Sequence, residues 1–289
     1  MTDQIVIVSM GQHTRLGDAL EYALAQTPFE TINAQELAKG NWVNRRLLFA
    51  ASADQRGENA SLRQLAAQLY GGECDLSGCA VAMIADGEQG GTIHLDALRL
   101  LTAANAAGAE ALARPLIESE RDLRSFAQEL GGRESGFERY RSLACALVER
   151  LAKCTPEKSD SRMFRLASAL DAGTANDWRA AIRRMLSAGN ATLSEDDSET
   201  EETIFLCENT EGLPDAGTIA QCKGSGSARF LIASPATGAE LYLAALFERA
   251  CLRGGYSLAP RGVLVFEGKS AVEVLASRVE MERVKRMFD

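Results

Sequence analysis

Short runs of apolar residues that lack polar alternation recur along this chain and constrain its fold more than any other feature. Clear examples are residues 5–8, 46–51, 79–85 and 229–233, and each run is followed by a stretch in which apolar residues recur with helical spacing. A strand that is apolar on both faces belongs in a sheet covered on both sides, and strands that alternate with helices form parallel sheets. The sequence therefore predicts an α/β protein with helices on both faces of parallel sheets.

This pattern is interrupted once and then starts again. Residues 154–161 are polar, contain Pro156 and lack periodicity, which is typical of a linker. We therefore predict two modules, residues 1–153 and residues 162–289. The second module shows only four strong apolar runs and ends just after a helical stretch, so we expect its sheet to be shortened by one strand.

Composition excludes several classes of partner. The net charge of −9 disfavours nucleic acid and anionic membranes, both of which attract a basic surface. The chain has no apolar run of about 18 residues and no signal-peptide pattern at its start, so we expect a cytoplasmic protein without a membrane partner. Seven cysteines at wide spacings and two histidines offer no recognisable metal site, and we expect the thiols to be reduced.

One stretch of the second module has the pattern of a phosphate-binding loop. An apolar run ends at Ser168, and the chain passes through Gly173 and Thr174 to Asn176 before a helical pattern begins. The first N–H groups of a helix have no partner within the helix, so they face an anion readily. An ordinary strand-to-helix turn capped by Thr174 or Asn176 remains an open alternative.

Two stretches of the first module are weaker candidates for anion loops. Residues 86–92 contain three glycines between a strand and a helix, and residues 9–15 follow the first apolar run. Neither contains GxGxxG or a P-loop pattern, so plain capped turns are the competing interpretation. The chain also lacks GxSxG, and we interpret His94 as a polar residue near a helix start.

The second module resembles the flavodoxin-like fold, and specifically the NADPH-dependent FMN reductase and iron–sulfur flavoprotein group. Residues 168–176 are similar to that group's Ser-x-x-x-Gly-Ser/Thr-x-Asn phosphate loop, and residues 234–238 resemble its Ser-Pro-x-Tyr loop. Residues 217–224 resemble its cysteine-containing segment. The first module resembles a region found ahead of the flavin domain in some two-part members.

The resemblance implies two flavodoxin-like three-layer modules, with an FMN site at the carboxyl edge of the second sheet. It assigns the cofactor to Ser168, Gly173, Thr174, Ala175, Asn176, Pro235, Ala236, Thr237 and Gly238. It further implies NAD(P)H as a co-substrate and a small-molecule flavin or electron acceptor as the partner. A homodimer is compatible with it.

The chain departs from this family pattern at the places where a flavin ring would be held. Ala236 stands where the group has an aromatic residue, and Glu267 with a single Gly268 replaces a glycine-rich turn. Trp178 and Lys269 are open to two interpretations each, either near the flavin or as a core tryptophan and a solvated lysine. Two hypotheses follow: an FMN-binding NAD(P)H-dependent oxidoreductase, or a non-catalytic binding or scaffold module that has lost flavin.

Overall fold

The structure is a computed structural model that describes residues 4–11, 14–54, 56–87, 93–119, 136–154, 163–188, 191–194 and 202–288. By the contacts within the chain, it divides into two compact units, Met1–Lys158 and Ser159–Asp289. The boundary falls within the segment 154–161 that the sequence marks as a linker, most of which lies outside the described residues.

The described residues of the first unit form a parallel sheet in the order β2-β1-β3-β4-β5. The strands are β1 (Ile5–Met10), β2 (Phe29–Asn33), β3 (Arg46–Ser52), β4 (Ala80–Asp86) and β5 (Glu110–Ser119). Every residue of β3 and β4 is buried, as expected for apolar runs covered on both faces.

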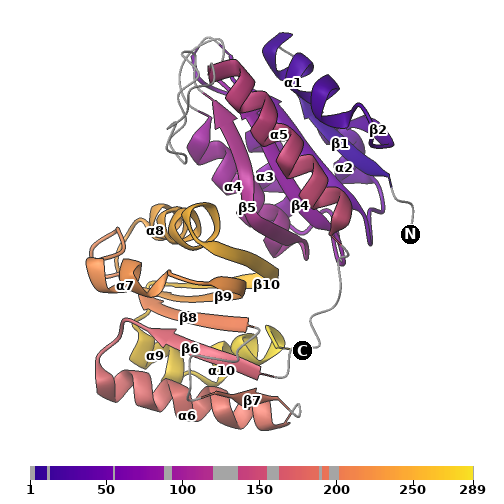
Figure 1. The fold of residues 1–289 in the computed structure, drawn as a ribbon. Coiled ribbons are helices and arrows are strands. Elements are labelled where there is room, and N and C mark those ends of the chain that lie inside the picture. The colour runs from indigo at the N-terminus through magenta and orange to yellow at the C-terminus, as the bar shows by residue number, and fades with distance from the viewer. Residues whose placement is uncertain are drawn as a thin grey trace. The chain divides into compact units, whose positions relative to one another are not determined.

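Helices cover both faces of this sheet (Figure 1). They are α1 (Thr14–Leu24), α2 (Ala34–Lys39), α3 (Ala60–Tyr70), α4 (His94–Ala106) and α5 (Gly136–Lys153). The helices α1 and α5 pack on one face, where Leu16 and Leu147 join Ile7 and Leu48 in one apolar cluster. The other helices lie on the opposite face, which completes a three-layer arrangement.

The second unit repeats this topology. Its described strands are parallel and follow the order β10-β9-β8-β6-β7. They are β6 (Met163–Ser168), β7 (Thr192–Leu193), β8 (Glu202–Glu208), β9 (Ser225–Ser234) and β10 (Gly255–Glu267). Numbered from the start of each unit, both sheets have the strand order 2-1-3-4-5, which is the flavodoxin-like arrangement.

The helices of the second unit also lie on two faces of its sheet (Figure 1). They are α6 (Ala172–Ala188), α7 (Ala216–Gln221), α8 (Ala239–Phe247), the π-helical turn η1 (Glu248–Arg253), α9 (Ala271–Ala276) and α10 (Arg278–Arg286). Trp178 of α6 and Val284 of α10 share an apolar cluster with Ile204 and Leu206 of β8, which places α6, α9 and α10 on one face.

The α/β class and the flavodoxin-like layering are therefore confirmed, but the expected loss of a strand from the second sheet is wrong. The second sheet has its fifth strand in β7, which pairs with β6 through Met163 and Thr192. A strand of two residues is too short to leave an apolar run in the sequence. The sequence pattern places the missing strand after the last helix, whereas the structure places it next to β6.

Side-chain caps explain where several helices begin. Asn33 and Glu36 form a capping box at the start of α2, and Ser270 and Glu273 form another at the start of α9. In each case the polar side chain of the cap accepts an N–H of the first turn, and the glutamate accepts the N–H of the cap residue. The same capping chemistry recurs at the site described next.

Candidate functional site

The start of α6 is closed by a carboxylate of the chain itself. The amide N–H of Thr174 donates to Oδ1 of Asp171 at 3.0 Å, and the amide N–H of Ala175 donates to the Asp171 carbonyl at 2.9 Å. Hydrogen bonds from the hydroxyl and then the N–H of Thr174 hold the pKa of the Asp171 carboxyl below its ordinary value. Asp171 is thus the cap of α6, and the interpretation that Thr174 or Asn176 caps this helix is wrong.

The other residues of the predicted phosphate loop do not form an open cup. Gly173, Ala175 and Asn176 lie in the first turns of α6 rather than in a loop. The side-chain oxygen of Asn176 accepts a hydrogen bond from Arg179 at 2.9 Å. At the end of β6, the hydroxyl of Ser168 accepts the N–H of Leu170 at 3.2 Å.

The second predicted loop follows β9 and is built around Asn209. Asn209 is fully buried; its side-chain amide donates to the hydroxyl of Ser234 at 2.8 Å, and its side-chain oxygen accepts the N–H of Gly212 at 2.8 Å. The backbone N–H of Ala236 donates to the Asn209 carbonyl at 3.2 Å. Asn209 therefore joins the loop after β8 to the loop after β9.

The exposed part of this second loop is short. Pro235, Thr237 and Gly238 are exposed, and Ala236 is half-buried. Gly238 has a φ of +88° and precedes α8 without a side-chain cap. The two groups of predicted residues lie at the carboxyl ends of β6 and β9, with β8 between them, and among the described residues no hydrogen bond joins one group to the other.

Trp178 and Lys269 both have structural roles. Trp178 is 0% exposed, and its indole N–H donates to the carbonyl of Ala271 at 3.2 Å, so it is a core residue. The ammonium group of Lys269 forms an ion pair with Glu280, which also pairs with Arg283.

The contacts at the start of α6 determine whether the second unit can bind the phosphate of FMN there. A phosphate at the N-terminus of α6 needs the first N–H groups of that helix and the hydroxyl of Thr174. The carboxylate of Asp171 already accepts from Thr174, and its negative charge repels a second anion at this position. The residues present do not fit the phosphate group, so no chemical step through FMN is derived.

The carboxyl edge of the first unit carries a row of buried polar residues. Ser52, Asp86 and Ser119 are register partners on β3, β4 and β5, and their exposed fractions are 4%, 0% and 4%. Arg15, in the first turn of α1, forms a bidentate ion pair with Asp86 and also donates to the hydroxyl of Ser119 at 3.2 Å. The buried carboxylate is thereby neutralised.

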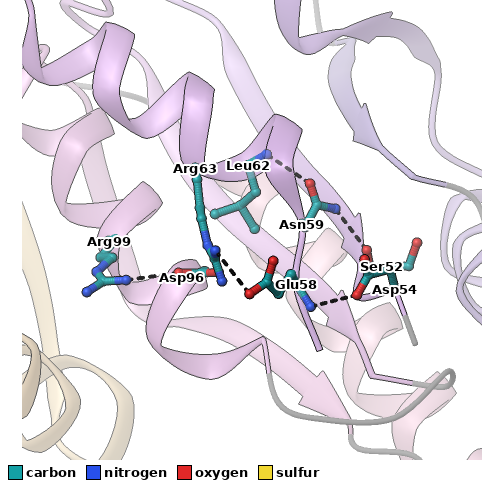
Figure 2. A network of polar contacts seen from close by, with 8 residues as sticks. All are labelled: Ser52, Asp54, Glu58, Asn59, Leu62, Arg63, Asp96 and Arg99. Atoms are coloured by element: carbon teal, nitrogen blue, oxygen red, sulfur yellow. Dashed lines mark hydrogen bonds and ion pairs between the residues drawn. The ribbon is translucent and has the colours of Figure 1, made fainter. Parts of the chain in front are cut away.

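A second network extends this edge toward α3 and α4 (Figure 2). Asn59 caps α3 by accepting the N–H of Leu62 at 2.9 Å, and its amide donates to the carbonyl of Ser52 at 2.8 Å. Arg63 reaches from α3 to Asp96 on α4 at 2.8 Å, and hydrogen bonding to Asp96 raises the pKa of Arg63. The network holds the loop after β3 against the two helices that follow.

The weaker candidate loops of the first unit are only partly described. Residues 88–92 and residues 12–13 lie outside the described residues. Within the described part, Asp86 and Arg15 form an ion pair with each other. His94 begins α4, where its Nδ1 lies 2.7 Å from a carboxylate oxygen of the buried Glu118.

All seven cysteines are free thiols, as expected for a reduced protein. Cys222, in the segment that resembles a family cysteine motif, is buried, and its thiol donates to the carbonyl of Thr218. Burial raises the pKa of Cys222 to about 11, so the thiolate form needed for nucleophilic or metal-binding chemistry is disfavoured. Among the described residues, no group of three histidine, cysteine or acidic side chains is arranged to hold a metal ion.

Sequence reasoning missed the two residues that organise these loops, Asp171 and Asn209. A signal for Asp171 is present, because an aspartate directly before an Ala-Gly-Thr sequence places an N-cap acceptor three residues before Thr174. Asn209 follows a buried strand and precedes a glycine turn, which marks a turn but not the partners of its side chain.

No protein-family model matches the chain, and no curated protein matches it. Among solved structures, the chain is similar to a mutant of the Fusobacterium nucleatum flavodoxin bound to flavin mononucleotide. The identity is 18%, the match covers 51% of this chain and 92% of that chain, and the TM-score is 0.32.

By its strand pairing, the chain is an α/β protein of two units, each with the flavodoxin-like strand order. Of the helices that the structure describes, none combines the length and the apolar character needed to cross a bilayer.

Proposed function

We propose that this protein is a non-catalytic, flavodoxin-like binding module whose second unit does not hold FMN at the predicted phosphate loop. The observation that carries the proposal is the bond from Thr174 to the Asp171 carboxylate at 3.0 Å. The N–H of Thr174, a donor that a phosphate at this helix start requires, already donates to this carboxylate, whose negative charge repels a phosphate. Fold likeness alone never establishes an activity.

Two further observations support this proposal. Trp178, the aromatic residue nearest to the predicted loop in sequence, is fully buried and serves the core. Ser234, which begins the second predicted loop, is also fully buried and is bonded within the protein to Asn209 and Ala236. These side chains maintain the fold of the carboxyl edge, and a flavin would have to displace their contacts in order to use them.

A second candidate function is an FMN-binding, NAD(P)H-dependent oxidoreductase. One observation favours it: the loops after β8 and β9 meet at Gly212 and Gly238, and Leu213 and Leu241 beside them are 64% and 48% exposed. Exposed apolar side chains next to glycine-bearing loops offer a surface for a planar ring. This candidate requires the ring to be held without the phosphate contacts of α6.

The visible absorption spectrum of the purified full chain distinguishes the two candidates. The proposal predicts a colourless protein that does not quench the fluorescence of added FMN. A yellow protein, or saturable quenching by FMN, overturns the proposal and supports the oxidoreductase. Loss of the flavin colour on mixing with NADPH or NADH would then establish the nicotinamide as the reductant.

A further inference from the structure

An open groove of about 630 Å³ lies on the second unit between α6 and the pair of helices α9 and α10. Its apolar lining comes from Ala180 and Met185 of α6, Leu275 of α9 and Met281 of α10. The nearby helices also expose Val272 at 60% and Val279 at 71%. Apolar side chains that gather in this way on a soluble protein mark an interaction surface.

Two charged residues border the groove on α6. Asp177 and Arg184 both line it, and among the described residues neither has a charged partner. They are separated by seven residues, which is about two helical turns, so they project from the same side of α6. The midpoint between them falls between Ala180 and Ala181, two small residues that also line the groove.

This arrangement is complementary to itself. If two copies of α6 pack antiparallel about a two-fold axis near Ala180, Asp177 of each copy faces Arg184 of the other. The small side chains at the axis allow close approach of the helices, and the apolar lining of each groove is covered by the other copy. A parallel arrangement would instead bring like charges together, which costs free energy.

From this charge pattern we infer that α6 is the centre of a homodimer interface and that the occupant of the groove is a second copy of this chain. The inference does not depend on whether the protein binds flavin, because the groove is lined by α6, α9 and α10 and by no residue of the loops after β8 and β9. The interface is isologous, so each substitution changes two contacts in the dimer.

The test is the oligomeric state of the full chain over a range of concentrations, measured by analytical ultracentrifugation. The wild type is expected to dimerise. Asp177→Arg and Arg184→Asp each place like charges opposite one another and are expected to raise the dimer dissociation constant at least about tenfold. The double variant D177R/R184D restores opposite charges across the axis and is expected to dimerise like the wild type.

Arg183→Asp is the matched control, because it makes the same charge change one residue away on a different side of α6. It is expected to leave the dimer unchanged. Circular dichroism checks that each variant is folded, and the rescue by the double variant excludes a general loss of structure. A wild-type protein that stays monomeric overturns the inference. So does a dimer whose dissociation constant is unchanged by both single substitutions, or one that the double variant does not restore.

Discussion

The amide N–H of Thr174 donates to the carboxylate of Asp171 at 3.0 Å, three residues along the chain. A Cβ added at Gly173 would lie 3.2 Å from the same carboxylate oxygen, so the carboxylate lies directly over the first turn of α6. An anion bound at a helix N-terminus occupies this same position. The second unit therefore satisfies its own helix start at the place where a flavodoxin-like protein is expected to receive a phosphate.

Replacing Asp171 tests this cap through its dependence on pH. Because the folded pKa is depressed, the carboxylate stabilises the protein above its ordinary pKa, and this stabilisation is lost as the pH falls through the folded pKa. Asp171→Ala is expected to lower Tm at pH 7, with a difference from the wild type that shrinks in acid. Asp171→Asn keeps an acceptor without the charge and is expected to lower Tm less. Calorimetry at pH 7 and in acid measures the Tm of the variants and of the wild type. A Tm difference that stays the same at both pH values would contradict the cap.

Gly11 is expected to tolerate no side chain. Its φ is +99°, and a Cβ would lie 2.6 Å from the hydroxyl oxygen of Ser52. Gly11→Ala is expected to cost about 1–3 kcal/mol of unfolding free energy in urea denaturation, from backbone strain and this contact. Ser52→Ala is the matched control. Among the described residues the buried hydroxyl of Ser52 has no partner, so its removal is expected to be nearly neutral and to rescue part of the Gly11→Ala loss.

The effects of substituting Arg15 and Asp86 on the free energy of unfolding are expected to be strongly coupled. Removing the guanidinium in Arg15→Met leaves a fully buried carboxylate without its cation, which typically costs about 3–5 kcal/mol. Asp86→Asn removes the buried charge, so adding it to Arg15→Met is expected to recover much of that loss. A double-mutant cycle of unfolding free energies measures the coupling, and additive losses would contradict it.

Trp178 is expected to behave as a core residue. Trp178→Ala removes a fully buried side chain and is expected to cost about 3–5 kcal/mol, while Trp178→Phe keeps most of the apolar volume and costs less. Trp42→Phe, at a half-buried position, serves as the control in the same urea denaturation series. A small loss in Trp178→Ala would indicate that the indole instead belongs to a ligand surface.

The fold was largely predictable because the strands are unbroken apolar runs. Residues 46–51 and 79–85 correspond closely to β3 and β4, every residue of which is buried. The strand β7 has only two residues, which is too short to produce a periodic pattern in the sequence. The strand β10 begins at Gly255 and has a register irregularity between Leu258 and Val263, which interrupts its apolar pattern.

The candidate site was less predictable because its chemistry depends on which donor meets which acceptor. Ser168, Thr174 and Asn176 have the residue types of a phosphate loop, and the cap signal of Asp171 does not by itself show that its carboxylate accepts the N–H of Thr174. The row of Ser52, Asp86 and Ser119 depends on strand register, which only the assembled sheet reveals. Residue type predicted candidate loops, and pairing across the fold determines which of their polar groups already have partners.

The backbone amide resonance of Thr174 during an FMN titration, followed by ¹H–¹⁵N NMR of the full chain, is the most direct test of the closed helix start. The account predicts that this resonance does not move as FMN is added, since its N–H remains bonded to Asp171. A saturable shift of the Thr174 amide, together with loss of its bond to the carboxylate, would contradict the account.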